Sequence, residues 1–256
     1  MYPPESILSV WRKFDNFPLE VLTKVWYDQQ SLDEKQRSVE LMKEHRQQYG
    51  TSGNCFDLSI WLLQEFKENG LYAYPVGHDW YTEKAHVAVV VLDEWGRRYL
   101  CDLGDQWILP ILLDEESEDF TNESLTGFFP AARVEVRPKP EEVTIVYHRP
   151  GGKLSSQTYQ LEPLTESELW IMAEFSQQNI NPRPLIESRV HTPSEVQHWE
   201  FNNWESFLST NDGLFYDPKL EKIDLLAERI SLRTGIVQKF VIETLEMYAT
   251  LSQKIR

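Results

Sequence analysis

The sequence predicts an α+β protein in three parts: a helical N-terminal subdomain over residues 1–78, an antiparallel β-rich, barrel-like middle over 79–164, and a mixed α/β C-terminal lid over 165–256. Three observations predict this order. Apolar residues recur at the helical period up to about residue 70, β-rich runs separated by turn residues follow, and helical patterns return after residue 165. With 256 residues, 41% of them hydrophobic, the chain is long enough for a substantial core.

Two helices are expected before the central stretch of the first part. Residues 17–22 start one of them, with Pro18 in the first turn. The pattern Ser-Leu-Asp-Glu at 31–34 is a capping box, and it predicts a second helix that runs to about Gln48 and ends before Gly50.

The stretch Gly53-Asn54-Cys55-Phe56-Asp57 predicts a helix N-terminus. Asn54 is a good N-cap, and Asp57 stands three residues later, where its carboxylate favours the first turn. Apolar residues at 58, 62, 63 and 66 share one face, and Asn69-Gly70 predicts the end of the helix. Cys55 therefore falls in the first turn, where unpaired N–H groups and the helix dipole favour a thiolate.

A β-hairpin is expected to follow. Residues 86–92 form a buried strand that opens with His86, residues 93–96 form a turn, and the return strand carries Asp102 near its end. If paired residues have numbers that sum to 188, His86 lies directly opposite Asp102 on the same face. This register requires an odd-length loop, and Gly96 is expected at the left-handed position of a three-residue turn.

Each of these three residues has a simpler explanation when taken alone. Cys55 can be a small buried hydrophobic residue, His86 a half-exposed residue at a strand end, and Asp102 an ordinary strand-end carboxylate. Together, a helix-start cysteine, a strand histidine and an aspartate on the facing strand form the arrangement used for acyl transfer. We therefore predict a Cys55–His86–Asp102 triad.

The rest of the chain gives coarser expectations. Residues 71–76 predict a strand, and His78 and Asp79 are expected in a surface loop after it. Residues 143–148 and 157–161 predict a second hairpin. A capping box predicts a helix over 165–180, residues 181–217 show no firm pattern, and residues 218–252 predict one or two helices broken near Gly235.

Charge and cysteine content exclude several classes of partner. The net charge of −16 argues against nucleic acid or an anionic membrane surface as the partner, and no apolar run is long enough to span a membrane. Two cysteines do not suggest a disulfide scaffold, and Cys101 is expected to point into the core. No metal-binding spacing or glycine-rich phosphate loop occurs. The N-terminal residues have neither the basic nor the apolar region of a signal peptide, and a reducing cytoplasm is the natural place for a free catalytic thiol, so a cytoplasmic location is expected.

Three segments resemble the signature segments of the arylamine N-acetyltransferases, within the transglutaminase-like cysteine-enzyme superfamily. They are Gly-Asn-Cys-Phe-Asp at 53–57, His-Val-Ala-Val-Val-Val at 86–91 and Tyr-Leu-Cys-Asp-Leu-Gly at 99–104. Tyr159, Phe175 and Asn179 are similar in layout only. The resemblance implies ping-pong transfer of an acetyl group from acetyl-CoA, through a Cys55 thioester, to a small-molecule amine of the arylamine or hydrazine type.

The sequence also departs from that family. The family's Arg-Gly-Gly before the cysteine is replaced by Thr51-Ser52-Gly53-Asn54, its glutamate two residues after the cysteine is Asp57, and its Gly-Phe-Gly after the aspartate is Gly104-Asp105-Gln106. Two alternatives therefore stay open. One is a cysteine amidase, peptidase or protein crosslinker on the same triad, and the other is a catalytically silent binding module.

Overall fold

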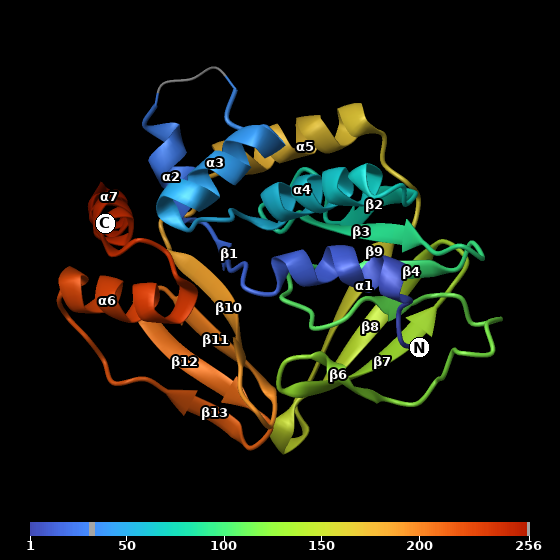
Figure 1. Cartoon of the computed structure of the whole chain (residues 1–256). Helices are drawn as coiled ribbons and strands as arrows, with labels where there is room; N and C mark the ends of the chain where they lie inside the picture. Colours follow the sequence, from blue (N-terminus) through green and yellow to red (C-terminus); the bar gives the residue numbers. More distant parts are fainter. Residues whose placement is uncertain (31–33, 255–256) are drawn as a thin grey trace.

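The computed structural model of the chain describes residues 1–30 and 34–254. Within these residues an eight-stranded sheet, a five-stranded sheet and the helices that cover them form the protein (Figure 1). The α-helices are α1 (Glu5–Trp11), α2 (Leu22–Asp28), α3 (Val39–Tyr49), α4 (Cys55–Glu68), α5 (Glu166–Gln178), α6 (Ile223–Thr234) and α7 (Gln238–Lys254). None of these helices is long and apolar enough to cross a membrane.

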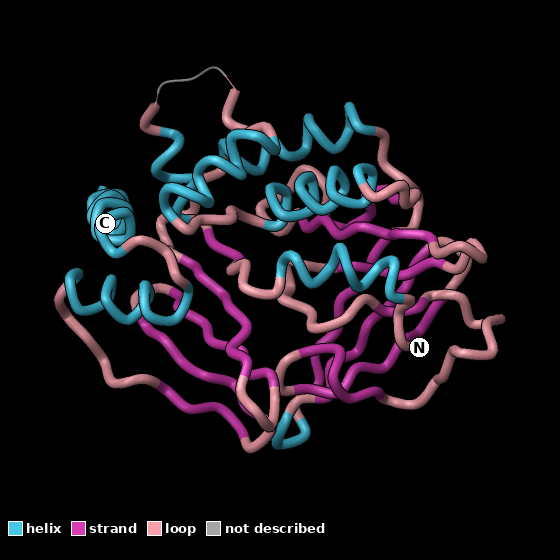
Figure 2. The backbone as a smooth tube through the Cα atoms, viewed as in Figure 1, coloured by secondary structure: helices cyan, strands magenta, loops and turns pink. Residues whose placement is uncertain are grey.

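The eight-stranded sheet curves into a nearly closed antiparallel barrel with the strand order β5-β4-β3-β2-β9-β8-β7-β6 (Figure 2). Its strands are β2 (Ala73–His78), β3 (His86–Leu92), β4 (Arg98–Cys101), β5 (Ile111–Leu112), β6 (Leu125–Phe129), β7 (Ala132–Pro138), β8 (Glu142–His148) and β9 (Leu154–Gln160). The α+β fold class with a β-rich, barrel-like middle is therefore confirmed, as are the strand at 71–76, here β2, and the second hairpin, here β8 and β9. The boundaries near residues 78 and 164 stay a prediction.

The five-stranded sheet has the order β1-β10-β11-β12-β13 and has its own apolar core. Its strands are β1 (Leu19–Glu20), β10 (Leu185–His191), β11 (Val196–Asn202), β12 (Glu205–Thr210) and β13 (Gly213–Tyr216). Residues of α2, α6 and α7 pack on this sheet, whereas α1, α3, α4 and α5 contribute to the larger core of the barrel. The chain thus has two cores, and α2 and α3, close in sequence, contribute to different ones.

The helix predicted at Cys55 is confirmed as α4. The Asn54 side chain accepts hydrogen bonds from the N–H groups of Phe56 at 3.0 Å and Asp57 at 3.2 Å, and Asp57 accepts from the Asn54 N–H at 3.1 Å. This reciprocal capping box fixes the first residue of the helix. At the other end, Gly70 takes the positive φ of 73° that follows the last turn.

The predicted register of the β3–β4 hairpin is wrong by two residues. Leu92 pairs with Arg98, so paired numbers sum to 92 + 98 = 190, and the loop has five residues, 93–97. The wider loop forms because the Asp93 carboxylate accepts hydrogen bonds from the N–H groups of Trp95 and Arg97, each at 2.9 Å. The parity of the register is unchanged, so the residues at 86 and 102 still share one face as diagonal neighbours.

Gly96 has the predicted left-handed conformation, with φ 79°. It lies in the five-residue loop rather than in a three-residue turn.

The N-terminal prediction at Pro18 is also wrong. Residues 19–20 form strand β1, which pairs with β10 (Leu19 with Glu187), and helix α2 begins only at Leu22. Glu20 supports this start, since its carboxylate accepts hydrogen bonds from the N–H groups of Thr23 at 2.8 Å and Gly53 at 2.7 Å. The strand depends on a partner more than 160 residues away along the chain, which a local pattern cannot reveal.

The C-terminal helices are confirmed, and residues 181–217 are not patternless. Helix α5 begins with the predicted capping box at Thr165, and α6 ends at Gly235, which has φ 75°. Between them lie the four strands β10 to β13. The β11–β12 turn is Asn203-Trp204, with φ 48° and 74°, and tryptophan at such a position is not a recognisable turn signal.

The second N-terminal helix begins later than predicted. Its capping box at 31–34 lies largely outside the described residues. Helix α3 instead begins at Val39 after the N-cap Ser38, and it ends at Gly50 as expected.

Candidate active site

Cys55 is the first residue of α4 and lines a pocket of about 510 Å³. The second cysteine, Cys101, is fully buried in the barrel core, as predicted, and burial raises its pKa well above the usual value. The two thiols therefore differ in access, and only Cys55 lines this pocket.

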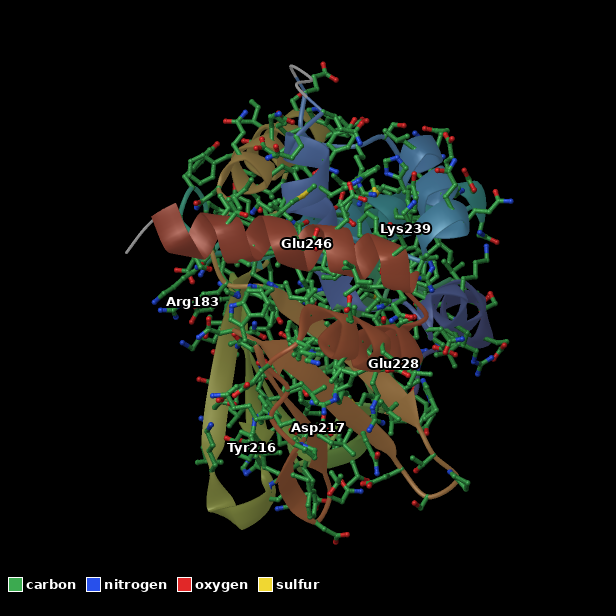
Figure 3. All side chains as sticks on the ribbon, turned by 90° about the vertical axis from the view of Figure 1, so that its left-hand side faces the viewer. Arg183, Tyr216, Asp217, Glu228, Lys239 and Glu246 are labelled. Carbon is green, nitrogen blue, oxygen red and sulfur yellow. The ribbon has the colours of Figure 1, made fainter. Side chains whose placement is uncertain are left out.

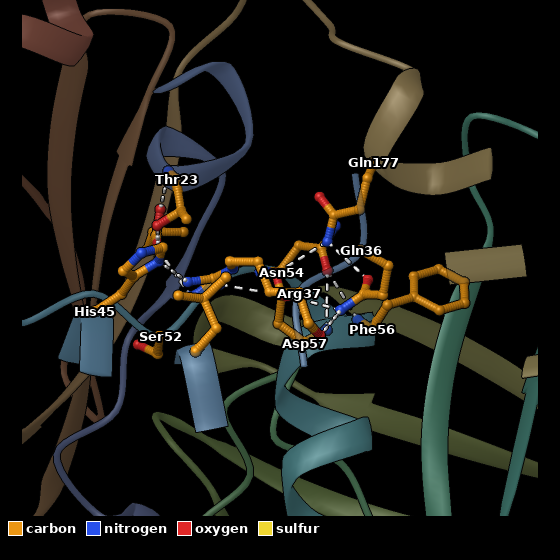
Figure 4. Close-up of polar contacts among 12 residues, drawn as sticks. Thr23, Gln36, Arg37, His45, Ser52, Asn54, Phe56, Asp57 and Gln177 are labelled. Atoms are coloured by element: carbon orange, nitrogen blue, oxygen red, sulfur yellow. Dashed lines mark hydrogen bonds and ion pairs between the residues drawn. The ribbon is translucent and has the colours of Figure 1, made fainter. Parts of the chain in front are cut away.

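A buried carboxylate holds the start of α4 in place (Figure 4). Asp57 forms an ion pair with Arg37 at 3.3 Å and accepts hydrogen bonds from the side-chain amides of Gln36 and Gln177, each at 3.0 Å. Gln36 and Arg37 come from the segment before α3, and Gln177 comes from the end of α5. Segments that are separate in sequence therefore meet at this carboxylate.

We expect the ion pair between Asp57 and Arg37 to stabilise the folded protein. Arg37→Met should lower the free energy of unfolding by about 3–5 kcal/mol, because it leaves the buried Asp57 carboxylate with its hydrogen bonds but without a counter-charge. Urea denaturation measures the change. As a control, Glu5→Ala removes an exposed ion pair with Arg12 and should cost less than about 1 kcal/mol. If Arg37→Met lowers the free energy of unfolding as little as the control does, the Asp57–Arg37 pair does not stabilise the fold.

His86 and Asp102, both predicted for the site, are in direct contact. His86 opens β3 and Asp102 follows β4, and their Nε2 and Oδ2 atoms lie 2.6 Å apart. Asp102 is fully buried, and it also accepts hydrogen bonds from the Tyr159 hydroxyl at 2.6 Å and from the Asp105 N–H at 2.8 Å. Since Asp102 holds Nε2, the other ring nitrogen, Nδ1, is left to face the thiol.

The electrostatics favour a charged pair. Burial by itself would lower the pKa of His86, but the charge of Asp102 and hydrogen bonds with Asp102 and Cys55 raise it well above the usual value. Burial would likewise raise the pKa of Asp102, whereas the charge of His86 and the hydrogen bonds it accepts lower it. The favoured state is therefore an imidazolium next to a carboxylate.

Gly104 lies where Cys55 and His86 meet. A Cβ atom added to Gly104 would lie 2.6 Å from the Cys55 Cβ and 2.9 Å from the His86 Cε1. Both distances are far below van der Waals contact, so the backbone at 104 packs directly on both side chains. The structure therefore brings Cys55, His86 and Asp102 together.

This contact predicts a sharp effect of Gly104→Ala. The added methyl group should separate the thiol from the imidazole and slow alkylation of Cys55 by iodoacetamide about a hundredfold. Gly70→Ala, at the other end of α4, is the control: its φ of 73° strains the backbone, but the new methyl group meets open space and touches neither the thiol nor the imidazole. Equal alkylation rates in the two variants, with both folded by circular dichroism, would show that the packing at Gly104 does not position the thiol.

His78 corrects the sequence prediction, which placed it in a surface loop. It is the last residue of β2 and pairs with His86 across the strands, and the two rings stack with centroids 5.3 Å apart. Asp79 takes a positive φ of 54°, and its carboxylate lies 3.0 Å from Nδ1 of the neighbouring His78. Burial and the charge of His86 lower the pKa of His78, which keeps it neutral.

A second carboxyl group lies beside the triad. Asp105 accepts hydrogen bonds from the Tyr147 hydroxyl at 2.5 Å and the Trp107 indole N–H at 3.0 Å. Burial and the charge of Asp102 raise the pKa of Asp105 to about 6. The sequence Gly104-Asp105-Gln106 gave no sign of these contacts, because Tyr147 lies 42 residues further along the chain and nothing in the sequence shows that the nearby Trp107 is buried.

The raised pKa makes a prediction about stability and pH. Folding favours the protonated Asp105 carboxyl, so this stabilisation is fully present below the ordinary pKa of 3.8 and is lost as the pH rises through about 6. Asp105→Asn should remove that loss. Relative to the wild type, the variant should gain about 2–3 kcal/mol in unfolding free energy between acidic and neutral pH.

Urea denaturation of both proteins at a series of pH values measures this difference. A constant difference across the series would show that Asp105 does not change its proton occupancy on folding.

Many polar side chains line the pocket in front of Cys55, beside aliphatic ones. Its amide side chains are Asn54, Gln157, Asn179, Asn181 and Asn202, and its cations are Lys24 and Arg183. Sequence reasoning singled out neither cation, because Lys24 comes from α2 and Arg183 from the loop before β10. Of the residues noted for similar layout, Tyr159 contacts Asp102 and Asn179 lines the pocket, whereas Phe175 is exposed.

Comparison with known proteins shows the fold. The sequence matches no protein-family model and no curated protein. The structure is similar over nearly its whole length to solved arylamine N-acetyltransferases. A cysteine-to-glutamine variant of the Mycobacterium smegmatis enzyme has a TM-score of 0.71 at 14% identity, covering 96% of this chain and 90% of that one.

Two further structures show the same similarity. The Mycobacterium marinum enzyme in complex with CoA has a TM-score of 0.70 at 11% identity, with 92% and 89% of the two chains covered. The Bacillus cereus enzyme, described as having a unique Cys-His-Glu catalytic triad, has 0.64 at 16%, with 91% and 90% covered. The chain therefore has the arylamine N-acetyltransferase fold, as the sequence resemblance predicted; identities this low show the fold alone.

Proposed function

We propose that the protein is a cysteine acyltransferase that moves an acetyl group from acetyl-CoA to a small-molecule amine. The observation that supports it most is the contact of His86 with Asp102 at 2.6 Å, next to a helix-start thiol in a pocket. This arrangement, on a fold shared with arylamine N-acetyltransferases, fits covalent catalysis by a thiol.

The proposed reaction has two steps. In the first, the Cys55 sulfur attacks the carbonyl carbon of the thioester, the carbon–sulfur bond of the donor breaks, and the CoA thiol leaves with a proton from His86. In the second, the amine attacks the acetyl group on Cys55, the new carbon–nitrogen bond forms, and His86 takes the amine proton. The acetylated amine leaves and the Cys55 thiol is restored.

The neighbouring groups have supporting roles in this proposal. Asp102 fixes the orientation of the imidazole and stabilises its charged form, and the Tyr159 hydroxyl holds Asp102. The backbone N–H of Cys55, which the first turn of α4 leaves unpaired, is available to the oxyanion that develops on the acetyl carbonyl. Arg183 is exposed at the pocket and is a cation available to the phosphates of an anionic donor.

Intact-protein mass spectrometry after brief mixing with acetyl-CoA tests the first step. The wild type should gain one acetyl group, and Cys55→Ala should gain none. Cys101→Ala is the matched control and should be acetylated as the wild type is, since its thiol is buried away from the pocket. Acetylation of Cys55→Ala, or an unmodified wild type whose Cys55 is still alkylated, would contradict acetyl-CoA as donor.

The lifetime of the acetyl-enzyme separates transfer from hydrolysis. A hydrolase on the same three residues differs only in whether water reaches the acyl group. The proposal predicts that the adduct persists in buffer and is discharged when an arylamine or hydrazine is added. Rapid loss of the adduct in buffer alone, with no acetylated amine formed, would favour an amidase or esterase.

A further inference from the structure

The pocket beside Cys55 differs in character from an aromatic amine site. Among its lining residues in the described ranges, Tyr248 is the only Phe, Tyr or Trp, and the Tyr248 hydroxyl donates to the Val21 carbonyl at 2.9 Å. Five amide side chains and five charged ones line the pocket together with four aliphatic residues. Amide and charged groups lose hydrogen bonds to water when a ligand covers them, so a ligand of this pocket is expected to carry polar groups that pair with them.

Lys24 is the charged group in this pocket that is partly buried and yet has no partner among the described residues, whereas Glu83 and Arg183 are exposed. It lies on α2, is partly buried, and makes no ion pair or hydrogen bond with any residue in 1–30 or 34–254. Burial lowers the pKa of Lys24 to about 8, while the charges of Cys55 and Asp57 oppose that shift. A partly buried ammonium group without a counter-charge is costly in the free protein, and an anion bound beside it would remove that cost.

The other charges of the pocket do not supply that anion. Glu187 is engaged with His198 at 3.0 Å, and Asp105 is held by Tyr147 at 2.5 Å, with a pKa raised to about 6 by burial and the charge of Asp102. Asp57, which also affects the pKa of Lys24, is paired with Arg37. Glu83 and Arg183 are exposed and of opposite sign. Lys24 therefore gives the inner part of the pocket a positive charge that these residues do not neutralise.

We propose that Lys24 binds a carboxylate of the acyl acceptor, so that the substrate is an amine that also carries a carboxylate group. This inference rests on the proposed function and names its substrate class. Lys24 and Cys55 line the same pocket, so a carboxylate at Lys24 and an amine facing the acetyl group on Cys55 can belong to one ligand.

The acceptor fits this subsite better than the donor does. Lys24 shares the pocket with the thiol, and its pKa responds to the charge of Cys55. The phosphates of CoA are separated from the thioester by the whole pantetheine arm, and the acetyl group itself is neutral. The transfer stays balanced: the carbon–nitrogen bond forms, the carbon–sulfur bond to Cys55 breaks, the sulfur leaves as a thiolate, the amine proton passes to His86, and the carboxylate takes no part.

The test compares discharge of the acetyl-enzyme by 4-aminobenzoate and by 4-aminobenzamide, which have the same ring and amine but differ in charge. The wild type should prefer the carboxylate, and Lys24→Met should lower that preference about tenfold. Lys239→Met is the matched control; Figure 3 shows Lys239 on the exposed face of α7, and it does not line the pocket. An equal preference in all three proteins would overturn the proposal.

A second experiment tests whether Lys24 contacts the phosphates of the donor instead. The enzyme is acetylated with acetyl-CoA and with p-nitrophenyl acetate, which has no phosphates. The proposal predicts that Lys24→Met changes the rates of acetylation by the two donors by the same factor. Slower acetylation by acetyl-CoA alone, with the acceptor preference unchanged, would assign Lys24 to the donor phosphates and overturn the proposal.

A third measurement needs no acyl transfer, so it separates failure of this inference from failure of the proposed function. Iodoacetate and iodoacetamide alkylate the same thiol and differ in carrying a carboxylate or an amide. The ratio of their rates at Cys55 should fall about tenfold in Lys24→Met and stay unchanged in Lys239→Met. An unchanged ratio in Lys24→Met would overturn the carboxylate subsite, even for a protein that acetyl-CoA does not acetylate.

Discussion

The buried carboxylate of Asp102 is the interaction on which the site depends. It is fully excluded from solvent, and it receives His86 at 2.6 Å, the Tyr159 hydroxyl at 2.6 Å and the Asp105 N–H at 2.8 Å. An ionised carboxylate in such a place is stable only with partners of this kind. The same bonds orient His86. They also connect the β3–β4 hairpin, the loop after β4 that contains Asp105, and strand β9, which carries Tyr159, around one charged pair.

A second buried carboxylate, Asp57, has the matching role for the helix. It caps α4 and pairs with Arg37, while Gln36 and Gln177 complete its hydrogen bonds. Thus both halves of the proposed thiol–imidazole pair are held by buried carboxylates, one from the helix and one from the barrel. Gly104 lets the two halves meet, since any side chain there would overlap Cys55 and His86.

The parts of the site that the sequence predicted are those that depend on short-range patterns. The capping residues around Cys55 are local, and the placement of His86 and Asp102 on one face needs only the parity of a hairpin, which survived a two-residue error in register. The parts it missed depend on distant chain segments. Lys24 and Arg37 reach the site from other parts of the chain, and the turn between β11 and β12, Asn203-Trp204, has no recognisable signal.

The central claim is that His86 is a protonated imidazole held by Asp102 beside the thiol. An NMR titration of protein labelled with ¹⁵N-histidine measures it directly, with Asp102→Asn for comparison. The account predicts that the His86 ring stays protonated well above the usual pKa of histidine, and that the variant loses this shift. A His86 ring that titrates at or below the usual histidine pKa, and equally in both proteins, would contradict it.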